Sequence, residues 1–192
     1  MENMYIDGRM HMRIYLRPIT LEDGPTIVKW RNAPSVSNHC FNKMPITIQS
    51  NESFYKANIE TGKYKQFIVQ RIDEDFGVIS YAIATVYLKD FDKVNKRCEL
   101  CVFTSDDQEW NTESQSMAIK QLLEKAFIEY EMHKVYTFVF AENKDEIELM
   151  KKSGLKEEAV LRKEAIDCNG NYVDILRMAI FFDEYEKGKE HE

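Results

Sequence analysis

The chain has 192 residues, of which 44% are hydrophobic and 12% aromatic, so it can bury one substantial core. Its net charge of -7 and isoelectric point near 5.3 argue against a nucleic-acid partner, because phosphate binding needs a basic face. No apolar run approaches the roughly 20 residues that span a bilayer, and no signal-peptide core precedes residue 13. We expect a cytoplasmic protein with no membrane or nucleic-acid partner, formed by one domain at 13–182 between flexible termini at 1–12 and 183–192.

The four cysteines are expected to be reduced thiols. Cys98 and Cys101 form a C-x-x-C string, but residues three apart on a strand point to opposite faces, which disfavours a disulfide or a shared metal. The four histidines have no spacing typical of zinc ligands. We therefore expect no metal site.

The first half of the chain predicts strands separated by two helices. Pro18 ends the first strand because proline cannot donate to a ladder, and Pro25 is tolerated in the first turn of the helix that follows. Ser50 is expected to cap a second helix, which Gly62 closes. The expected elements are a strand at 13–17, a helix at 20–32, a functional loop at 34–45, a helix at 50–62, and an antiparallel meander of strands at 66–72, 77–88 and 96–103, with an Asp-Glu-Asp turn inside the meander.

The second half predicts a helical crossover and a hairpin. Apolar residues recur at helical spacing after residue 114, so this helix should pack one side on the sheet: Ile119, Leu122, Leu123, Ala126, Phe127 and Tyr130. A crossover of this kind makes the next strand, 134–141, parallel to the strand that ends at Phe103. Asn143 should cap another helix, and Asn169-Gly170 predicts a hairpin of strands at 160–167 and 172–181.

The junction between the strand ending at Phe103 and the following helix is the first candidate site. A strand that leads through a turn into a helix start presents backbone N–H groups and a helix dipole to an anion. The turn, from Asp106 to Gln115, contains no glycine. The sequence therefore predicts an α/β protein with one parallel pair in its sheet and an anion site beside that pair.

From about Tyr15 to Ile180 the chain resembles the GCN5-related N-acetyltransferases, in the branch of the ribosomal-protein alanine acetyltransferases and amino-sugar-nucleotide acetyltransferases. The resemblance rests on several short motifs in order: Leu16-Arg17-Pro18, Trp30-Arg31-Asn32, Asn95-Lys96-Arg97-Cys98-Glu99-Leu100, Ala141-Glu142-Asn143, Lys152-Ser153-Gly154-Leu155 and Asn169-Gly170-Asn171-Tyr172-Val173-Asp174. It implies a mixed, mostly antiparallel sheet of about seven strands, with a central parallel pair splayed in a V and about four flanking helices.

The resemblance also implies acetyl-CoA as the acetyl donor, held between the splayed strands and by the turn before the helix. The implied cofactor-binding residues are Leu100, Val102, Phe103, Trp110, Asn111, Thr112, Ser114, Gln115 and Asn143. Asn111 and Glu113 stand where the family has glycines, and a carboxylate near a pyrophosphate is repelled by about 1 kcal/mol. Asn143 either reaches the cofactor or only caps its helix. The tyrosine that many relatives use as a general acid falls on Met150.

Glu99 is the candidate base that accepts the amine proton, directly or through water; the alternative is a cross-strand partner of Arg97 or Lys96. The candidate substrate-binding residues are Trp30, Arg31, Asn32, Phe41 and Tyr81, with Tyr87 as a further wall residue. Arg31 could hold an anionic group of the acceptor. The alternatives are core packing for Trp30, a helix C-terminal charge for Arg31, and core or surface positions for the other aromatic residues.

Two functions follow from these features. The first is an enzyme that moves an acetyl group from acetyl-CoA to a primary amine of a small molecule, an amino sugar or a peptide N-terminus, as a monomer or homodimer. The alternative is a non-catalytic, acetyltransferase-like domain that binds or senses a ligand, because its turn has lost the family's glycines.

Overall fold

The structure, a computed structural model, describes residues 5–6, 9–10, 13–38, 40–73, 79–103 and 105–189. Within these ranges the helices and strands in chain order are β1 (Tyr5–Ile6), β2 (Arg9–Met10), β3 (Arg13–Pro18), a 3-10 turn (Leu21–Asp23), α1 (Gly24–Asn32), α2 (Pro34–Ser37), α3 (Ile48–Phe54) with a π-helical turn (Tyr55–Ile59), β4 (Lys65–Asp73), β5 (Ile79–Asp92), β6 (Arg97–Phe103), α4 (Thr112–Glu124) with a π-helical turn (Lys125–Glu129), β7 (Lys134–Phe140), α5 (Lys144–Lys152), β8 (Lys156–Ile166), β9 (Tyr172–Phe181) and α6 (Phe182–Lys189).

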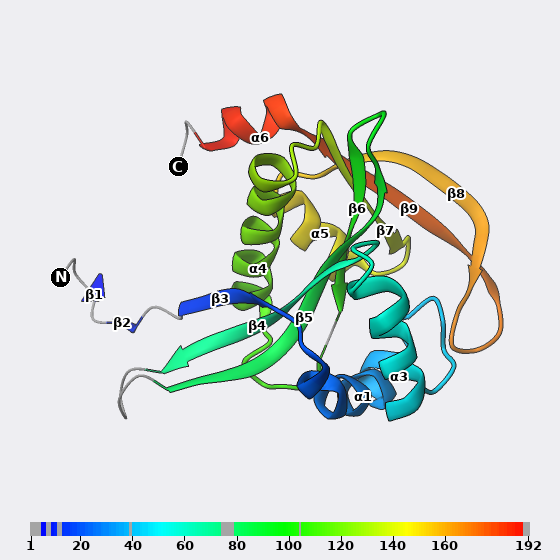
Figure 1. Ribbon diagram of the computed structural model, residues 1–192. Coiled ribbons are helices and arrows are strands. Elements are labelled where there is room, and N and C mark those ends of the chain that lie inside the picture. Colours follow the sequence, from blue (N-terminus) through cyan, green and yellow to red (C-terminus); the bar gives the residue numbers. More distant parts are fainter. Residues whose placement is uncertain are drawn as a thin grey trace.

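The main sheet has seven strands in the order β3-β4-β5-β6-β7-β9-β8 among the described residues (Figure 1). Every neighbouring pair is antiparallel except β6 and β7, which are parallel. The predicted mixed sheet with one central parallel pair is therefore confirmed. In the described ranges six α-helices accompany it, rather than about four, because α2 and α6 were not expected from the pattern.

The parallel strands separate after a short paired segment. Arg97 pairs with Lys134, Cys98 with Val135 and Glu99 with Tyr136, and the printed register stops there. β6 nevertheless continues to Phe103 and β7 to Phe140, each still paired with its other neighbour. The predicted V is therefore present, and it opens immediately beyond Glu99.

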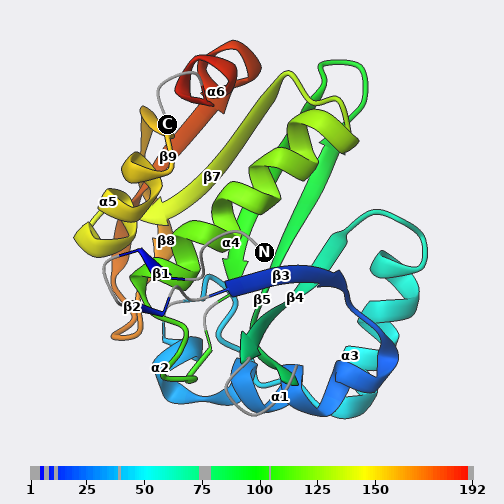
Figure 2. The ribbon, with the colours of Figure 1, turned by 90° about the vertical axis from the view of Figure 1, so that its left-hand side faces the viewer.

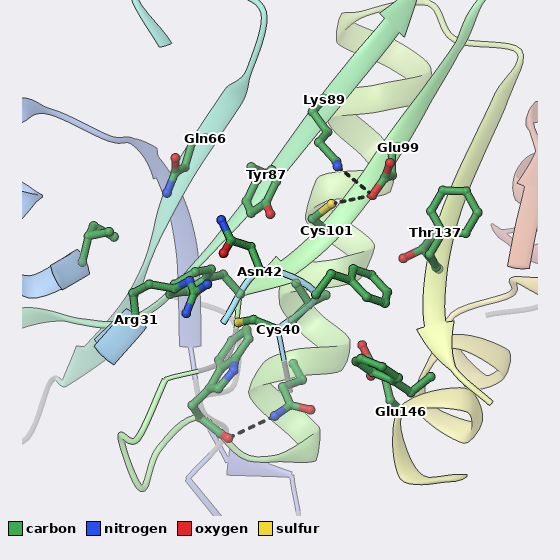
Figure 3. Close-up of a pocket in the computed structure, with 18 of the residues that line it drawn as sticks. Arg31, Cys40, Asn42, Gln66, Tyr87, Lys89, Glu99, Cys101, Thr137 and Glu146 are labelled. Atoms are coloured by element: carbon green, nitrogen blue, oxygen red, sulfur yellow. Dashed lines mark hydrogen bonds and ion pairs between the residues drawn. The ribbon is translucent and has the colours of Figure 1, made fainter. Parts of the chain in front are cut away.

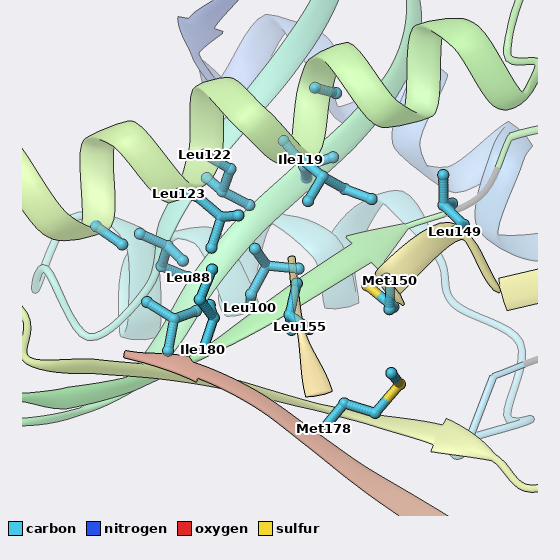
Figure 4. Close-up of a cluster of buried hydrophobic side chains, with 14 of the residues drawn as sticks. Leu88, Leu100, Ile119, Leu122, Leu123, Leu149, Met150, Leu155, Met178 and Ile180 are labelled. Atoms are coloured by element: carbon cyan, nitrogen blue, oxygen red, sulfur yellow. The ribbon is translucent and has the colours of Figure 1, made fainter. Parts of the chain in front are cut away.

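Helix α4 covers one face of the sheet, beside β7 in Figure 2. The predicted apolar residues Ile119, Leu122 and Leu123 of α4 are buried in the same core as Leu88 and Leu100 (Figure 4). Ala126 and Phe127 of the π-helical turn are buried in it too, and Tyr130 packs against it partly buried. Burial of each large side chain stabilises the fold by about 1.5–3 kcal/mol. This packing fixes the start of α4 next to the open end of the V.

Helix α1 packs on the opposite face. Ile27 and Trp30 of α1 form a second core cluster with Ile68, whereas the neighbouring Phe67 and Val69 belong to the α4 cluster. Since alternate residues of a strand point to opposite faces, α1 and α4 lie on different sides of β4. The same alternation places Glu99 and Cys101 on the α1 side, because Cys98 and Leu100 belong to the α4 core.

The structure corrects two local predictions. Thr47, not Ser50, is the N-cap of α3: its hydroxyl accepts from the Ser50 amide at 3.1 Å, and Ser50 Oγ accepts from the Thr47 amide at 2.8 Å. The segment from Asp183 to Lys189, expected to fray, belongs to α6, because the rings of Phe182 and Tyr185 pack on Phe127. Of the expected Asp-Glu-Asp turn, Asp73 is the last residue of β4, and the other two residues lie outside the described ranges.

Candidate active site

A cavity of about 750 Å³ lies where β6 and β7 separate. Its walls come from α1, the segment 40–46 and α3 on one side, from β5 and β6, and from the starts of α4 and α5 (Figure 3). This size is ordinary for a small-molecule site. The chain therefore brings elements from both of its halves together around one pocket.

Glu99 is the central charged group of this pocket. Its side chain is buried, with only 6% of the residue exposed, and Oε1 receives two contacts: Cys101 Sγ donates at 3.1 Å, and Lys89 Nζ lies at 3.2 Å (Figure 3). Burial raises the pKa of the Glu99 carboxyl, while the thiol of Cys101 and the cation of Lys89 oppose this increase. The carboxylate is thus both desolvated and held in place.

The predicted cross-strand partners of Glu99 are wrong. Lys89 on β5 pairs directly with Glu99, whereas Arg97 Nε contacts Asp92 Oδ2 at 3.2 Å. Lys96 is exposed in the turn before β6. Glu99 therefore does form a cross-strand ion pair, but its partner is Lys89 of β5. Lys89 is ten residues earlier in the chain, so the sequence next to Glu99 does not reveal it.

A second pair of groups extends this network. Tyr87 is hydrogen-bonded to Cys101, and burial raises the pKa of the Tyr87 hydroxyl and of the Cys101 thiol well above their ordinary values. Both groups are therefore protonated at neutral pH, and Tyr87, Cys101 and Glu99 form a continuous chain. Cys98 points into the core, where burial raises its pKa to about 12. The prediction of free thiols on opposite faces is confirmed.

The open end of the V contributes the predicted residues Val102 and Phe103, which line the pocket opposite Thr137 and Phe138 of β7. The side chain of Leu100 is fully buried in the core and does not face the pocket. Leu100 can therefore contact a ligand in the pocket only through its backbone.

The turn before α4 provides fewer pocket residues than expected. Thr112 and Gln115 line the cavity, as does Trp110, whose indole Nε1 is buried without a hydrogen-bond partner among the described residues. Asn111 instead caps α4: its Oδ1 accepts from the amides of Glu113 at 3.0 Å and Ser114 at 3.2 Å. Two of the amides that a pyrophosphate could use at the helix start, those of Glu113 and Ser114, are thus occupied by Asn111.

Two further features of this turn differ from the expectation. The hydroxyl of Ser114 is buried and donates to the Glu109 carbonyl at 2.7 Å, so it does not face the cavity. Glu113 is exposed at the surface and does not line the pocket. The Glu113 carboxylate therefore does not fill the pocket, although Glu113 is the second residue of α4.

Asn143 caps α5 and also lines the pocket, and its predicted contact with the cofactor stays a prediction. Its Oδ1 accepts from the Glu146 amide at 3.3 Å, which caps α5, and its Nδ2 donates to Glu146 Oε2 at 2.8 Å. Both residues line the pocket. Burial raises the pKa of Glu146 to about 7, although the bond from Asn143 lowers it. Met150, at the position of the family's tyrosine, is buried and lines the same wall.

The five candidate substrate-binding residues separate into two groups. Arg31 and Phe41 line the pocket, and Phe41 packs on Phe140 with ring centroids 4.9 Å apart. Trp30 is buried in the α1 core cluster, so the packing alternative describes it. Asn32 points to the segment 40–46, where it accepts from the Ile46 amide at 2.9 Å and donates to the Ile46 carbonyl at 2.8 Å.

Tyr81 also lies away from the pocket, since its hydroxyl accepts a hydrogen bond from Arg71 near the start of β5.

Several pocket residues were not predicted from the sequence, chiefly Lys89, Cys101 and Glu146. Lys89 follows Tyr87 by two residues and therefore shares its face, a signal that could have identified it. Among the described residues no group of three His, Cys, Asp or Glu side chains is arranged to hold a metal, and no helix is long and apolar enough to cross a membrane.

Comparison with known proteins identifies the class. Residues 13–156 match the acetyltransferase (GNAT) domain family. The spermidine N(1)-acetyltransferase of Escherichia coli K12 is 24% identical over 172 residues, which cover 90% of this chain and 88% of that protein. The corresponding Vibrio cholerae protein is 22% identical over 176 residues, 92% and 97% of the two chains.

A crystal structure of spermidine N-acetyltransferase from Vibrio cholerae, in complex with CoA and spermine, has the same fold, with a TM-score of 0.81 and 22% identity. The superposition covers 90% of this chain and 98% of that chain. The chain therefore belongs to the GNAT family of acetyltransferases, as its motifs indicated. The narrower branch expected from the sequence stays a prediction.

Proposed function

We propose that this protein transfers an acetyl group from acetyl-CoA to the primary amine of a small molecule, with Glu99 as the proton acceptor. The observation that carries this proposal is the position of Glu99: a buried carboxylate located where the parallel strands separate, inside the pocket. Its burial and its raised pKa are typical of a general base. The family supplies the reaction class.

The residues of the pocket fit the donor. The edge of β6 beyond Glu99, which has no partner on β7 in the register, offers amides and carbonyls to a pantetheine amide chain, and the indole N–H of Trp110, unbonded among the described residues, offers a further donor. Thr112 Oγ1 offers a hydroxyl for the pyrophosphate beside the start of α4. Acetyl-CoA supplies the activated thioester carbonyl. An in-line arrangement of thioester and amine can lower the barrier by several kcal/mol through proximity alone.

The chain's own groups then handle the protons. A primary amine is protonated in neutral water, so Glu99 must accept a proton, directly or through water, before the nitrogen can attack. Lys89 favours the ionised form of Glu99 and keeps it competent as a base. Tyr87 is a protonated hydroxyl in the same pocket, and it can donate its proton to the departing thiolate. The proton that Glu99 has accepted from the amine can then return to Tyr87 through Cys101.

The test measures binding and turnover separately. Calorimetric titration with acetyl-CoA should give a dissociation constant at or below the micromolar-to-millimolar range usual for substrates. Release of free CoA thiol should then depend on an added amine. The amine panel contains spermidine, because the relatives are named for it, together with amino sugars, amino acids and peptides with a free N-terminus.

Two results would contradict the proposal: no heat on titration with acetyl-CoA, or binding with no thiol release from any amine of the panel. The second result would instead support the non-catalytic alternative. The feature that favours that alternative is the capped turn at Asn111. The retained, buried Glu99 favours the enzyme.

A further inference from the structure

Arg31 is a buried cation in the pocket, and no described residue forms an ion pair with it. Only 7% of the residue is exposed, and its Nη1 has no hydrogen-bond partner among the described residues. Figure 3 shows the guanidinium extending from α1 toward Cys40 in the pocket. A buried charge without a partner is costly, and proteins seldom retain one without a function.

None of the three carboxylates that line the pocket forms an ion pair with Arg31. Glu99 is bound by Lys89 and Cys101, and Glu146 accepts from Asn143. Asp145, the remaining carboxylate of the described lining, forms no ion pair with Arg31 within 4.0 Å. The C-terminal dipole of α1 favours a cation here, but it is a weak and local effect compared with the loss of hydration.

Arg31 lies on the acceptor side of the sheet. Its helix packs on Ile68, on the face that also carries Glu99, whereas α4 and its N-terminal turn belong to the opposite face. An anion held by Arg31 would therefore share a face with the candidate base. The backbone and side chains proposed for the donor phosphates come instead from the start of α4.

We infer that the acceptor is an amine that also carries an anionic group, a carboxylate or a phosphate, and that Arg31 binds this group while Glu99 faces the amine. This inference rests on the proposed function and narrows its substrate class. A guanidinium suits both anions because its planar N–H groups can donate in pairs. The requirement separates this chain from its relatives, since spermidine carries no anion.

The experiment compares acceptors that differ only in the anion. Lysine is compared with cadaverine, its decarboxylated form, and glucosamine 6-phosphate with glucosamine, so that the two pairs distinguish carboxylate from phosphate. Spermidine is the cationic reference. We expect kcat/KM for the anionic member of at least one pair to exceed that of its partner, and that of spermidine, by about tenfold or more.

Variants of Arg31 test the residue itself. Arg31→Gln should lower kcat/KM for the anionic acceptor by about 10- to 100-fold and change that for the partner without the anion by no more than about twofold. Arg31→Lys keeps the charge without the paired N–H groups and should recover part of the loss. Arg162→Gln removes an exposed arginine from β8 and should leave both activities unchanged. The KM for acetyl-CoA should stay constant in all variants.

The inference is overturned if neither lysine nor glucosamine 6-phosphate is a better acceptor than both its own partner and spermidine, or if Arg31→Gln raises the KM for acetyl-CoA and not that for the acceptor. In those cases acetyl transfer itself still stands. If acetyl-CoA does not bind, or no amine reacts, the proposed function fails and this inference fails with it. Thermal unfolding of each variant separates loss of recognition from loss of the fold, and the comparison of acceptors with the unmodified protein does not depend on any variant.

Discussion

Glu99 and Arg31 are two buried charges of one pocket, and their surroundings differ. Their exposed fractions are 6% and 7%, so both are removed from water to a similar degree. Glu99 has a cation at 3.2 Å and a thiol donor at 3.1 Å, while Nη1 of Arg31 has no partner within the described chain. The comparison teaches that two equally buried charges can differ in their partners: the fold itself supplies those of Glu99, whereas under our proposal a ligand would supply that of Arg31.

The largest expected effect comes from the paired charge. Glu99→Gln keeps the shape of the side chain but removes the base, so kcat/KM should fall by about 10²- to 10⁴-fold, measured by thiol release with the best acceptor. The affinity for acetyl-CoA, measured by calorimetry, should not change. Glu146→Gln is the matched control, because Glu146 is the other carboxyl of this pocket with a raised pKa. A larger loss in Glu146→Gln would move the role of base to Glu146.

The second prediction breaks the pairing of Glu99. Lys89 lowers the pKa of Glu99, so Lys89→Met should raise this pKa further above its ordinary value. Since the ionised form accepts the proton, the acidic limb of the pH profile of kcat/KM should move to higher pH. At pH near 6 we expect about a tenfold loss, which should diminish as the pH rises. Lys89→Arg should restore the original profile; an unshifted profile in Lys89→Met would show that Lys89 has only a structural role.

The third prediction concerns the stability of the unpaired charge. Arg31→Met replaces a guanidinium that has no ion pair by an apolar side chain of similar length, so the free energy of unfolding at neutral pH should stay constant or rise by about 1 kcal/mol. Urea unfolding measures it. The same substitution at the paired position, Lys89→Met, should lower stability because it leaves Glu99 buried without its cation. A marked loss of stability in Arg31→Met would show that Arg31 has a partner in the folded protein.

The smallest expected effect concerns the capped turn. Asn111→Gly removes the side chain that occupies the amides of Glu113 and Ser114, and glycine is itself an acceptable N-cap, so stability should fall by only a few tenths of a kcal/mol. The freed amides should tighten acetyl-CoA binding by a few-fold, measured by calorimetry. Weaker binding would mean that Asn111 itself contacts the donor. Thr61→Gly, at a turn remote from α4, controls for the added backbone freedom.

Much of the fold could be predicted from local signals. The periodicity of α4 placed its apolar face, and the crossover it forms required β7 to be parallel to β6. The cap of α3 was placed three residues late, because Thr47 and Ser50 are both good caps and only the hydrogen bonds decide between them. Helix α6 was not predicted because its segment is mostly charged, and the contacts of Phe182 and Tyr185 with Phe127 are visible only in the folded protein.

The residues of the candidate site were harder to predict from local sequence than the helices and strands. Glu99 was proposed because its strand leads toward the expected thioester position, and Phe41 because it belongs to the aromatic loop; both line the pocket. Trp30 and Tyr81 were assigned to the same site by their residue type, but their contacts with the α1 core and with Arg71 depend on packing. An aromatic side chain in a sequence does not reveal which surface will cover it.

The sequence by itself determined the order of elements and the parallel pair, because these depend on periodicities within a few residues of chain and on the helical crossover. The tertiary structure decided which charges meet. Lys89 meets Glu99 because the register of β5 on β6 places them opposite each other. Helix α1 packs on Ile68 of a strand distant in sequence, and in this position Nη1 of Arg31 has no hydrogen-bond partner among the described residues. Partners of this kind are set by three-dimensional distance, which no local pattern of residues encodes.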